Sequence, residues 1–180
     1  MKNPKNKGSA FERQICKDLS LWISNGQNDN LLWRSSISGG RFTTGLKSNK
    51  NYKNQSGDIC AIDPQGHKLT DKFSIECKHY RNIHIGSLIF GTPKDQSMLS
   101  FWGQTKKDAE LAKKIPLLIV KQNNNQPLIS LNIEMAKKLL PLIDNILYPI
   151  AIFYKNNLFL FDFYSFLENI KFKDWENTTN

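Results

Sequence analysis

The chain has 180 residues, of which 39% are hydrophobic, and this is enough for one globular domain with one core. Its three cysteines argue against a disulfide scaffold, because they are odd in number and lack a framework spacing. No apolar run is long enough to cross a bilayer, and no apolar segment typical of a signal peptide follows the basic N-terminus, so we expect a cytoplasmic protein. The formal net charge of +9 favours a polyanionic partner, most often nucleic acid, although the Lys- and Asn-rich composition is also typical of AT-rich genomes.

The N-terminal part predicts a basic tail followed by a helix. Residues 1–7 read as the tail, and a helix is expected over 8–24. Ser9 is a candidate N-cap, and Glu12 three residues later completes a capping box. Phe11, Ile15 and Leu19 recur at helical spacing and predict one apolar face, which Glu12 borders.

A short strand and a long polar connection come next. The stretch "LLWRSSIS", residues 31–38, predicts a strand that runs into a loop. Residues 38–57 are rich in Gly, Ser, Asn and Lys. Connections of this length in compact domains are usually functional or disordered.

Two apolar runs with charged residues follow. Residues 57–63 and 73–80 predict strands, and "DPQG" between them predicts a turn. Side chains alternate along a strand, so Glu76 and Lys78 project from the same face of the second strand. Asp58 opens the first strand and can reach Glu76 if the two strands pair.

The remaining chain alternates between helical and extended patterns. We expect a helix over 97–114, an apolar strand over 115–122, a helix over 131–146 that ends or breaks near Pro141, a hairpin over 149–163 and a short helix over 164–172. This order predicts an α/β or α+β fold with a mixed sheet flanked by helices.

Two carboxylates and a lysine on neighbouring strands suit metal-assisted hydrolysis. Converging carboxylates repel unless a cation lies between them, and Mg²⁺ takes one or two carboxylates together with water and phosphate oxygens. Lys78 could orient the attacking water or stabilise charge on the phosphate. The alternative is an edge strand with a solvated acid–base face, which the tripeptide Glu76-Cys77-Lys78 alone would favour.

Asp58 followed by Glu76-Cys77-Lys78 resembles the D…ExK signature of PD-(D/E)XK nucleases. Gly57 stands where the family name implies proline. The resemblance implies a PD-(D/E)XK, restriction-endonuclease-like core. It also implies a metal site of Asp58, Glu76 and the backbone carbonyl of Cys77, with Mg²⁺ as cofactor and Mn²⁺ as a substitute.

The segment "KGSAFERQICKDL" resembles the first-helix motif of archaeal-type Holliday junction resolvases, a branch of that superfamily. This likeness adds Glu12 to the metal site, directly or through water, and maps Arg34 and Ser35 onto an "RS" segment. The segment from 101 to 121 resembles the helix–strand pair that follows the ExK strand, and it places Gln104 near the metal. The resemblance covers about residues 7–121 of a single domain, 1–180, and leaves 122–180 as an unmatched C-terminal extension. The composition suits a phage or mobile-element version, acting in a bacterial or phage-infected host cytosol.

The resemblance implies a Mg²⁺-dependent endonuclease acting on branched DNA as a homodimer. Residues expected to contact DNA are Lys7, Arg13, Arg34, Ser35, Ser38, Arg41, Lys47, Lys50, Lys53 and Lys106. Phe159, Phe161 and Phe163, on one alternating face of the hairpin, are a candidate dimer interface. Two alternatives stay open: a restriction-type or repair nuclease that cuts linear duplex, and a catalytically silent DNA-binding module.

Overall fold

The computed structural model describes residues 4–35, 56–91, 95–139, 141 and 149–178. They form two compact units, each made from two segments of the chain. The first unit combines residues 1–77 with 105–116, and the second combines 78–104 with 117–180. Three elements run from one unit into the other: β3 (Phe73–Tyr80), α5 (Met98–Ala112) and β4 (Ile115–Gln122). The prediction of a single domain with an extension from residue 122 stays a prediction.

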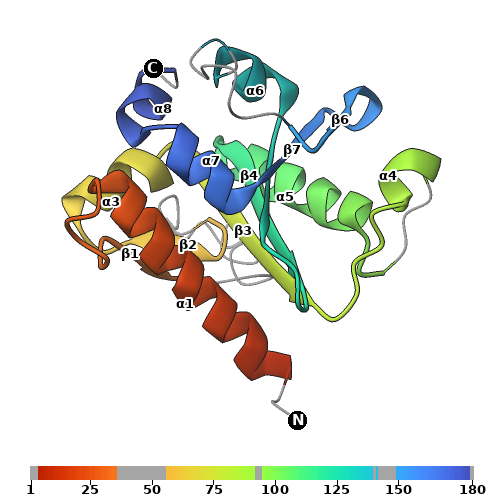
Figure 1. Cartoon of the computed structure of the whole chain (residues 1–180), viewed down its shortest axis with the longest axis horizontal. Helices are drawn as coiled ribbons and strands as arrows, with labels where there is room; N and C mark the ends of the chain where they lie inside the picture. The colour runs from red at the N-terminus through yellow and green to blue at the C-terminus, as the bar shows by residue number, and fades with distance from the viewer. Residues whose placement is uncertain (1–3, 36–55, 92–94, 140, 142–148, 179–180) are drawn as a thin grey trace. The chain divides into compact units, whose positions relative to one another are not determined.

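The first unit is built around the N-terminal helix. It contains α1 (Pro4–Ile23), β1 (Leu32–Arg34), β2 (Ile59–Ala61) and α3 (Pro64–Thr70). β1 pairs antiparallel with β2, and α1 and α3 both pack against this two-stranded ribbon (Figure 1). The apolar face predicted for the first helix is confirmed, because Phe11, Ile15 and Leu19 are buried.

Two local predictions in this unit are wrong. α1 begins at Pro4, where the fixed φ of proline suits a first helical position, so Ser9 lies inside the helix and does not cap it. The "DPQG" stretch is the start of α3 and not a turn between paired strands. Asp63 is the N-cap, its side chain accepts a hydrogen bond from Gln65 N at 2.9 Å, and Pro64 opens the helix.

The second unit contains the greater part of the sheet. Its further elements are α4 (Ser87–Phe90), β5 (Leu128–Leu131), α6 (Ile133–Leu139), β6 (Ala151–Phe153), the 3-10 turn η2 (Tyr154–Asn156), β7 (Leu158–Asp162), α7 (Phe163–Asn169) and α8 (Phe172–Thr178). The hairpin predicted over 149–163 is confirmed by the antiparallel pair β6–β7, and Asn157 between the two strands is left-handed at φ 54°. The sequence patterns missed α4, β5 and α8, and residues 140 and 142–146 of the helix predicted over 131–146 lie outside the described part.

The five-stranded sheet has the order β3-β4-β5-β7-β6 and is mixed. β4 runs parallel to β3: Ile115 N donates to Lys72 O at one end, and Asn123 N donates to Tyr80 O at the other. The remaining pairs, β4–β5, β5–β7 and β6–β7, are antiparallel. The predicted α/β fold with a mixed sheet flanked by helices is therefore confirmed.

Within the second unit, helices cover both faces of the sheet. Leu118 and Val120 of β4 and Leu160 of β7 join a buried cluster with Phe101 and Trp102 of α5. On the other face, the Phe161 ring of β7 contacts Phe166 of α7, which contacts Trp175 of α8 (Figure 1).

The predicted dimer interface is wrong in this fold. Phe159 and Phe161 are only 2% and 0% exposed and stack on each other, with ring centroids 6.1 Å apart. Phe163 is also fully buried and opens α7 instead of extending the strand. These rings form the chain's own core. None of the helices in the described ranges is both long enough and apolar enough to span a membrane.

Candidate active site

Asp58 lies against one edge of β3, held by its backbone and its side chain. Gly57 forms a parallel bridge with Ile75, and Asp58 N donates to Ile75 O at 2.7 Å. One step along, the Asp58 carboxylate accepts a hydrogen bond from Cys77 N at 2.9 Å. The side chain thus continues the hydrogen bonding that the backbone begins, which fixes the carboxylate beside the Glu76–Cys77 segment. Asp58 approaches β3 as predicted. The approach depends on the Gly57–Asp58 segment and not on pairing between β2 and β3.

Gly57 makes this approach possible. Its φ is +83°, and a Cβ at this position would lie 2.4 Å from Ile75 O and 2.8 Å from Ile75 N. Proline, with φ fixed near −65°, could not adopt this backbone. The backbone at position 57 of this chain therefore requires glycine and excludes the proline that the family name implies.

Glu76 and Asp58 are both buried, at 4% and 7% exposure. The first five residues of β3 are buried on both faces, so the alternative of a solvated acid–base face is excluded for Glu76. Burial raises the pKa of the Cys77 thiol well above its ordinary value, and the negative charges of Asp58, Glu76 and Glu12 raise it further.

Glu12 reaches this region from α1 and is held by an arginine. Arg34, at the end of β1, donates from Nε to a carboxylate oxygen of Glu12 in a half-buried ion pair. The pKa of Cys16, one turn after Glu12, is raised to about 12, mainly by burial and then by the charges of Cys60 and Glu12, while Arg34 lowers it. Arg34 is predicted from the sequence as a DNA contact, whereas the structure pairs it with Glu12. Glu12 and Arg34 lie on two separately predicted elements, so no local sequence pattern indicates that they form an ion pair.

Lys78 lies two residues beyond Glu76 on β3, in the second unit. Its Nζ lies 6.0 Å from the centroid of the Phe101 ring, and Phe101 also stacks on Tyr80 at 5.1 Å. Gln104 follows Phe101 by about one turn of α5 and is exposed. The contact between Phe101 and Lys78 could not be predicted from the sequence, because it depends on how α5 packs on the sheet.

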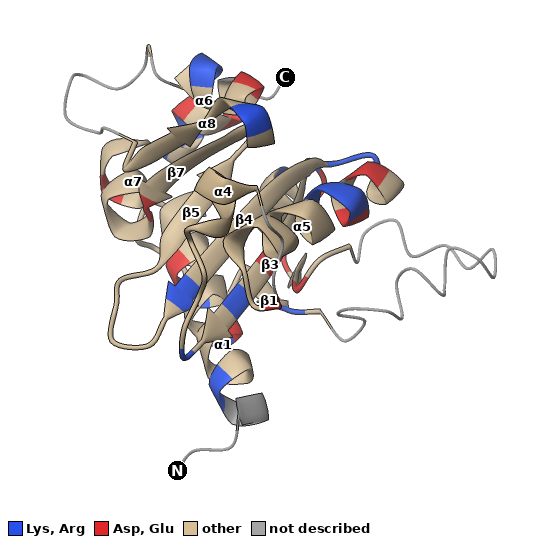
Figure 2. Ribbon diagram, turned by 90° about the vertical axis from the view of Figure 1, so that its right-hand side faces the viewer, with Lys and Arg blue, Asp and Glu red and all other residues tan. Residues whose placement is uncertain are grey.

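Apart from Arg34, which pairs with Glu12, the residues predicted to contact DNA divide into three groups. Arg13 is exposed on α1, whereas Lys7 on α1 and Lys106 on α5 are half-buried. Figure 2 shows basic and acidic positions close together along the ribbon of α5. Ser35 is 6% exposed, and its N–H donates to Asp58 O at 2.8 Å, so its backbone supports the Asp58 segment. Ser38, Arg41, Lys47, Lys50 and Lys53 lie outside the described residues.

The acids of the first unit suit a hard cation such as Mg²⁺. Among the residues described, no three His, Cys, Asp or Glu side chains converge closely enough to hold a metal ion. One or two carboxylates with additional oxygen ligands is nevertheless the donor set that Mg²⁺ takes in proteins. Asp58, Glu76 and the Cys77 carbonyl are the groups of this segment that could supply such a set.

A family model described as "Phage putative PDDEXK endonuclease" matches residues 3–177. The chain belongs to this phage PD-(D/E)XK endonuclease family. Membership agrees with the D…ExK residues and with the mixed sheet, and it indicates nuclease activity. The match also covers residues 122–177, which the likeness to resolvases left unmatched. No curated protein and no solved structure matches the chain.

Proposed function

We propose that the chain is a Mg²⁺-dependent endonuclease that hydrolyses phosphodiester bonds in branched DNA. The observation that carries the proposal is the Asp58 carboxylate bound to Cys77 N beside buried Glu76, in a chain that belongs to an endonuclease family. Burying two carboxylates near each other costs free energy, and a bound cation would offset that cost.

Each residue has a distinct role in the proposed reaction. Asp58, Glu76 and the Cys77 carbonyl would hold the cation. Glu12 would join directly or through water, in the orientation that its ion pair with Arg34 fixes. The bound cation would polarise the phosphate and lower the pKa of an attacking water. Lys78, held along the Phe101 ring, donates a hydrogen bond to that water or to the phosphate oxygen on which charge develops. The likeness to resolvases is the basis for proposing a supporting role for Gln104.

Binding of DNA rests on the basic residues. Arg13 and the lysines at 7 and 106 would contact phosphates, and the basic residues between 41 and 53 would add further contacts. The four-way junction is proposed as the substrate from the likeness of the first helix to junction resolvases. Symmetric cleavage of two strands would require a two-fold homodimer.

A substrate panel tests the proposal. Wild-type protein would be incubated with Mg²⁺ and labelled four-way junction, linear duplex or single strand, beside Glu76→Gln and the control Glu110→Gln, an exposed acid of α5. We expect paired symmetric nicks in the junction, lost with Glu76→Gln and kept with Glu110→Gln.

The other outcomes separate the alternatives. Cleavage of linear duplex would replace the junction specificity with a restriction or repair activity. Tight junction binding without cleavage of any substrate would favour a catalytically silent DNA-binding module. A monomeric mass in light scattering at micromolar concentration would contradict the homodimer.

A further inference from the structure

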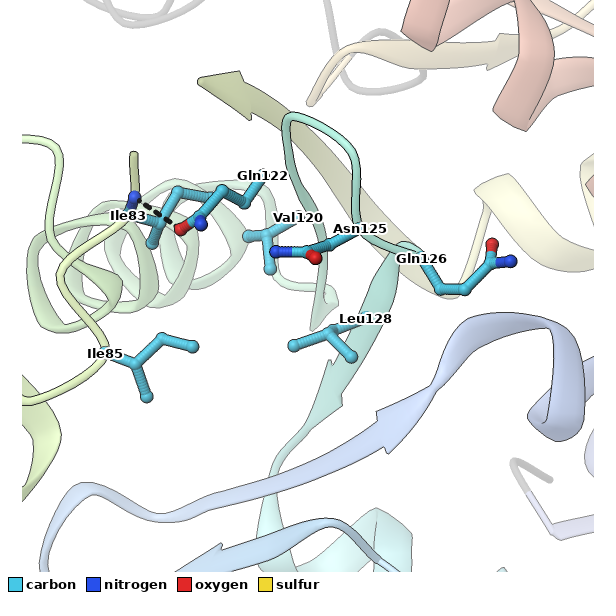
Figure 3. A pocket seen from close by; sticks show the side chains of 7 residues that line it. All are labelled: Ile83, Ile85, Val120, Gln122, Asn125, Gln126 and Leu128. Carbon is cyan, nitrogen blue, oxygen red and sulfur yellow. Dashed lines mark hydrogen bonds between the residues drawn. The ribbon is translucent and has the colours of Figure 1, made fainter. Parts of the chain in front are cut away.

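The second unit contains a cavity of about 250 Å³ beyond the end of β3 (Figure 3). Its walls are apolar: Val120 forms a buried part at 3% exposure, and Ile85, at 42% exposure, marks the mouth. Ile83 and Leu128 complete these walls. The volume is below the range of about 300–1,000 Å³ typical of sites for drug-sized ligands, so the cavity suits a smaller group, of the size of one ring system.

Amide groups lie at one side of this cavity. The Gln122 side-chain oxygen accepts a hydrogen bond from Ile83 N at 3.0 Å, which fixes the amide and leaves its NH₂ group as a donor. Asn125 is held by a turn in which its N–H donates to Gln122 O at 3.1 Å. Figure 3 shows the Asn125 side chain directed toward Val120, whereas Gln126 points away from the other lining residues. Proteins hold an unstacked base by packing apolar or aromatic side chains on its faces and by hydrogen bonds to its edge, and apolar walls with a few fixed amides supply both kinds of contact.

The cavity is near Lys78 along the chain and near an exposed cation. Ile83 follows Lys78 by five residues, so their Cα atoms lie at most about 18 Å apart, roughly five nucleotide steps of duplex DNA. Arg81, two residues before Ile83, is exposed and could contact a phosphate next to a base in the cavity.

We propose that this cavity binds one unstacked nucleobase of the DNA strand held at the active site. The inference rests on the proposed nuclease function. It extends that function by adding a binding site for a base to the phosphate contacts already proposed. Bases leave the stack most readily in branched or single-stranded regions, so the site would favour such substrates over intact duplex.

Methyl NMR of the full chain, labelled at Ile, Leu and Val and without divalent metal, tests the inference. The probes are a deoxyadenosine tetranucleotide, whose base edge suits an Asn amide, and an abasic tetranucleotide with the same phosphates. We expect the Ile85, Val120 and Leu128 methyl signals to shift and saturate with the first probe only. Asn125→Ala should weaken binding of that probe by about 2- to 12-fold, the effect of one lost hydrogen bond, while the matched control Gln126→Ala leaves it unchanged.

The outcomes separate failure of the base site from failure of the nuclease proposal. Equal binding of both probes, or shifts confined to other methyl groups, would overturn the base site and leave phosphate binding intact. Binding of neither probe would overturn the base site and would also count against a DNA substrate. Equal weakening by Asn125→Ala and Gln126→Ala would overturn the role of Asn125.

Discussion

At the scale of residues, each candidate group of the active site is held by a neighbour. Asp58 is held by Cys77 N, Glu12 by Arg34, and Lys78 lies along Phe101. Groups that position a metal ligand are nearly as important as the ligand itself. The predictions at this scale therefore concern Arg34 and the cysteines that surround the acids.

Replacing Arg34 with alanine should weaken the site without removing any proposed metal ligand. Glu12 would lose its ion pair in a half-buried position, and we expect metal affinity or kcat to fall by about 10- to 100-fold, with Arg34→Lys intermediate. Lys17→Ala, which breaks the exposed ion pair with Asp29, is the matched control. Equal metal affinity and kcat in wild type and Arg34→Ala would show that the pair is only structural.

The thiols should react slowly with alkylating reagents in the folded protein. Burial raises the pKa of all three cysteines, so less thiolate is present at a given pH; for Cys16, with a pKa of about 12, the ionised fraction at pH 8 is only about 10⁻⁴. We expect half-buried Cys60 to react first and buried Cys16 and Cys77 to follow only on unfolding. Mass spectrometry after timed alkylation at pH 8 measures the order. Early modification of Cys77 would contradict its placement beside Asp58 and Glu76.

The sign of the pH dependence of stability follows from the same pKa. Above the ordinary thiol pKa near 9, the unfolded state releases a proton that folded Cys16 retains until about pH 12. The contribution of Cys16 to the free energy of unfolding is therefore complete below pH 9 and is lost as pH rises toward 12. Urea unfolding of wild type and Cys16→Ala should show a smaller decline in stability between pH 8 and 10 for the variant. An equal decline in both would contradict the raised pKa.

At the scale of elements, the close approach of the Gly57–Asp58 segment to β3 builds the site. Gly57→Ala should both destabilise the fold and displace Asp58, because the new Cβ would meet Ile75 backbone atoms as close as 2.4 Å. Gly26→Ala is a matched control: its φ is also positive, at +84°, but open space surrounds the new Cβ.

Backbone strain alone should cost about 1–2 kcal/mol in each glycine variant. The clash adds to this at residue 57, so we expect Gly57→Ala to lose at least twice as much free energy of unfolding as Gly26→Ala, and to lose nuclease activity that Gly26→Ala keeps. Urea unfolding and a cleavage assay provide the two measurements. Similar losses in both variants would contradict the role of the close approach.

The sequence predicted those elements whose signals are local. Apolar spacing identified α1 and α5, and alternation placed Glu76 and Lys78 on one face of β3. The start of α1 at Pro4 and the helix after Asp63 could have been found from the preference of proline for the first helical position. β5 and the burial of Phe159 and Phe161 could not, because they depend on which strands pair and which helices cover them. The pairing of Glu12 with Arg34 also joins two elements that are distant in the sequence, so local signals could not predict it.

At the scale of the whole molecule, the formal charge of +9 predicts strongly salt-dependent DNA binding. The logarithm of affinity should fall linearly with the logarithm of salt concentration, by about 0.9 per phosphate contact. Arg13→Ala should reduce that slope by about one contact, and Lys173→Ala on α8 should leave it unchanged. Fluorescence anisotropy over a salt series measures both slopes. An unchanged slope for Arg13→Ala would remove α1 from the DNA interface.

The central claim is that Asp58 and Glu76 form the metal site of an endonuclease. Titration calorimetry with Mn²⁺ tests it most directly, because it needs no choice of DNA substrate. We expect saturable Mn²⁺ binding to wild type and to the control Asp95→Asn, which changes an exposed acid, and we expect binding to be lost in Asp58→Asn and Glu76→Gln. Undiminished binding in both Asp58→Asn and Glu76→Gln would contradict the assignment.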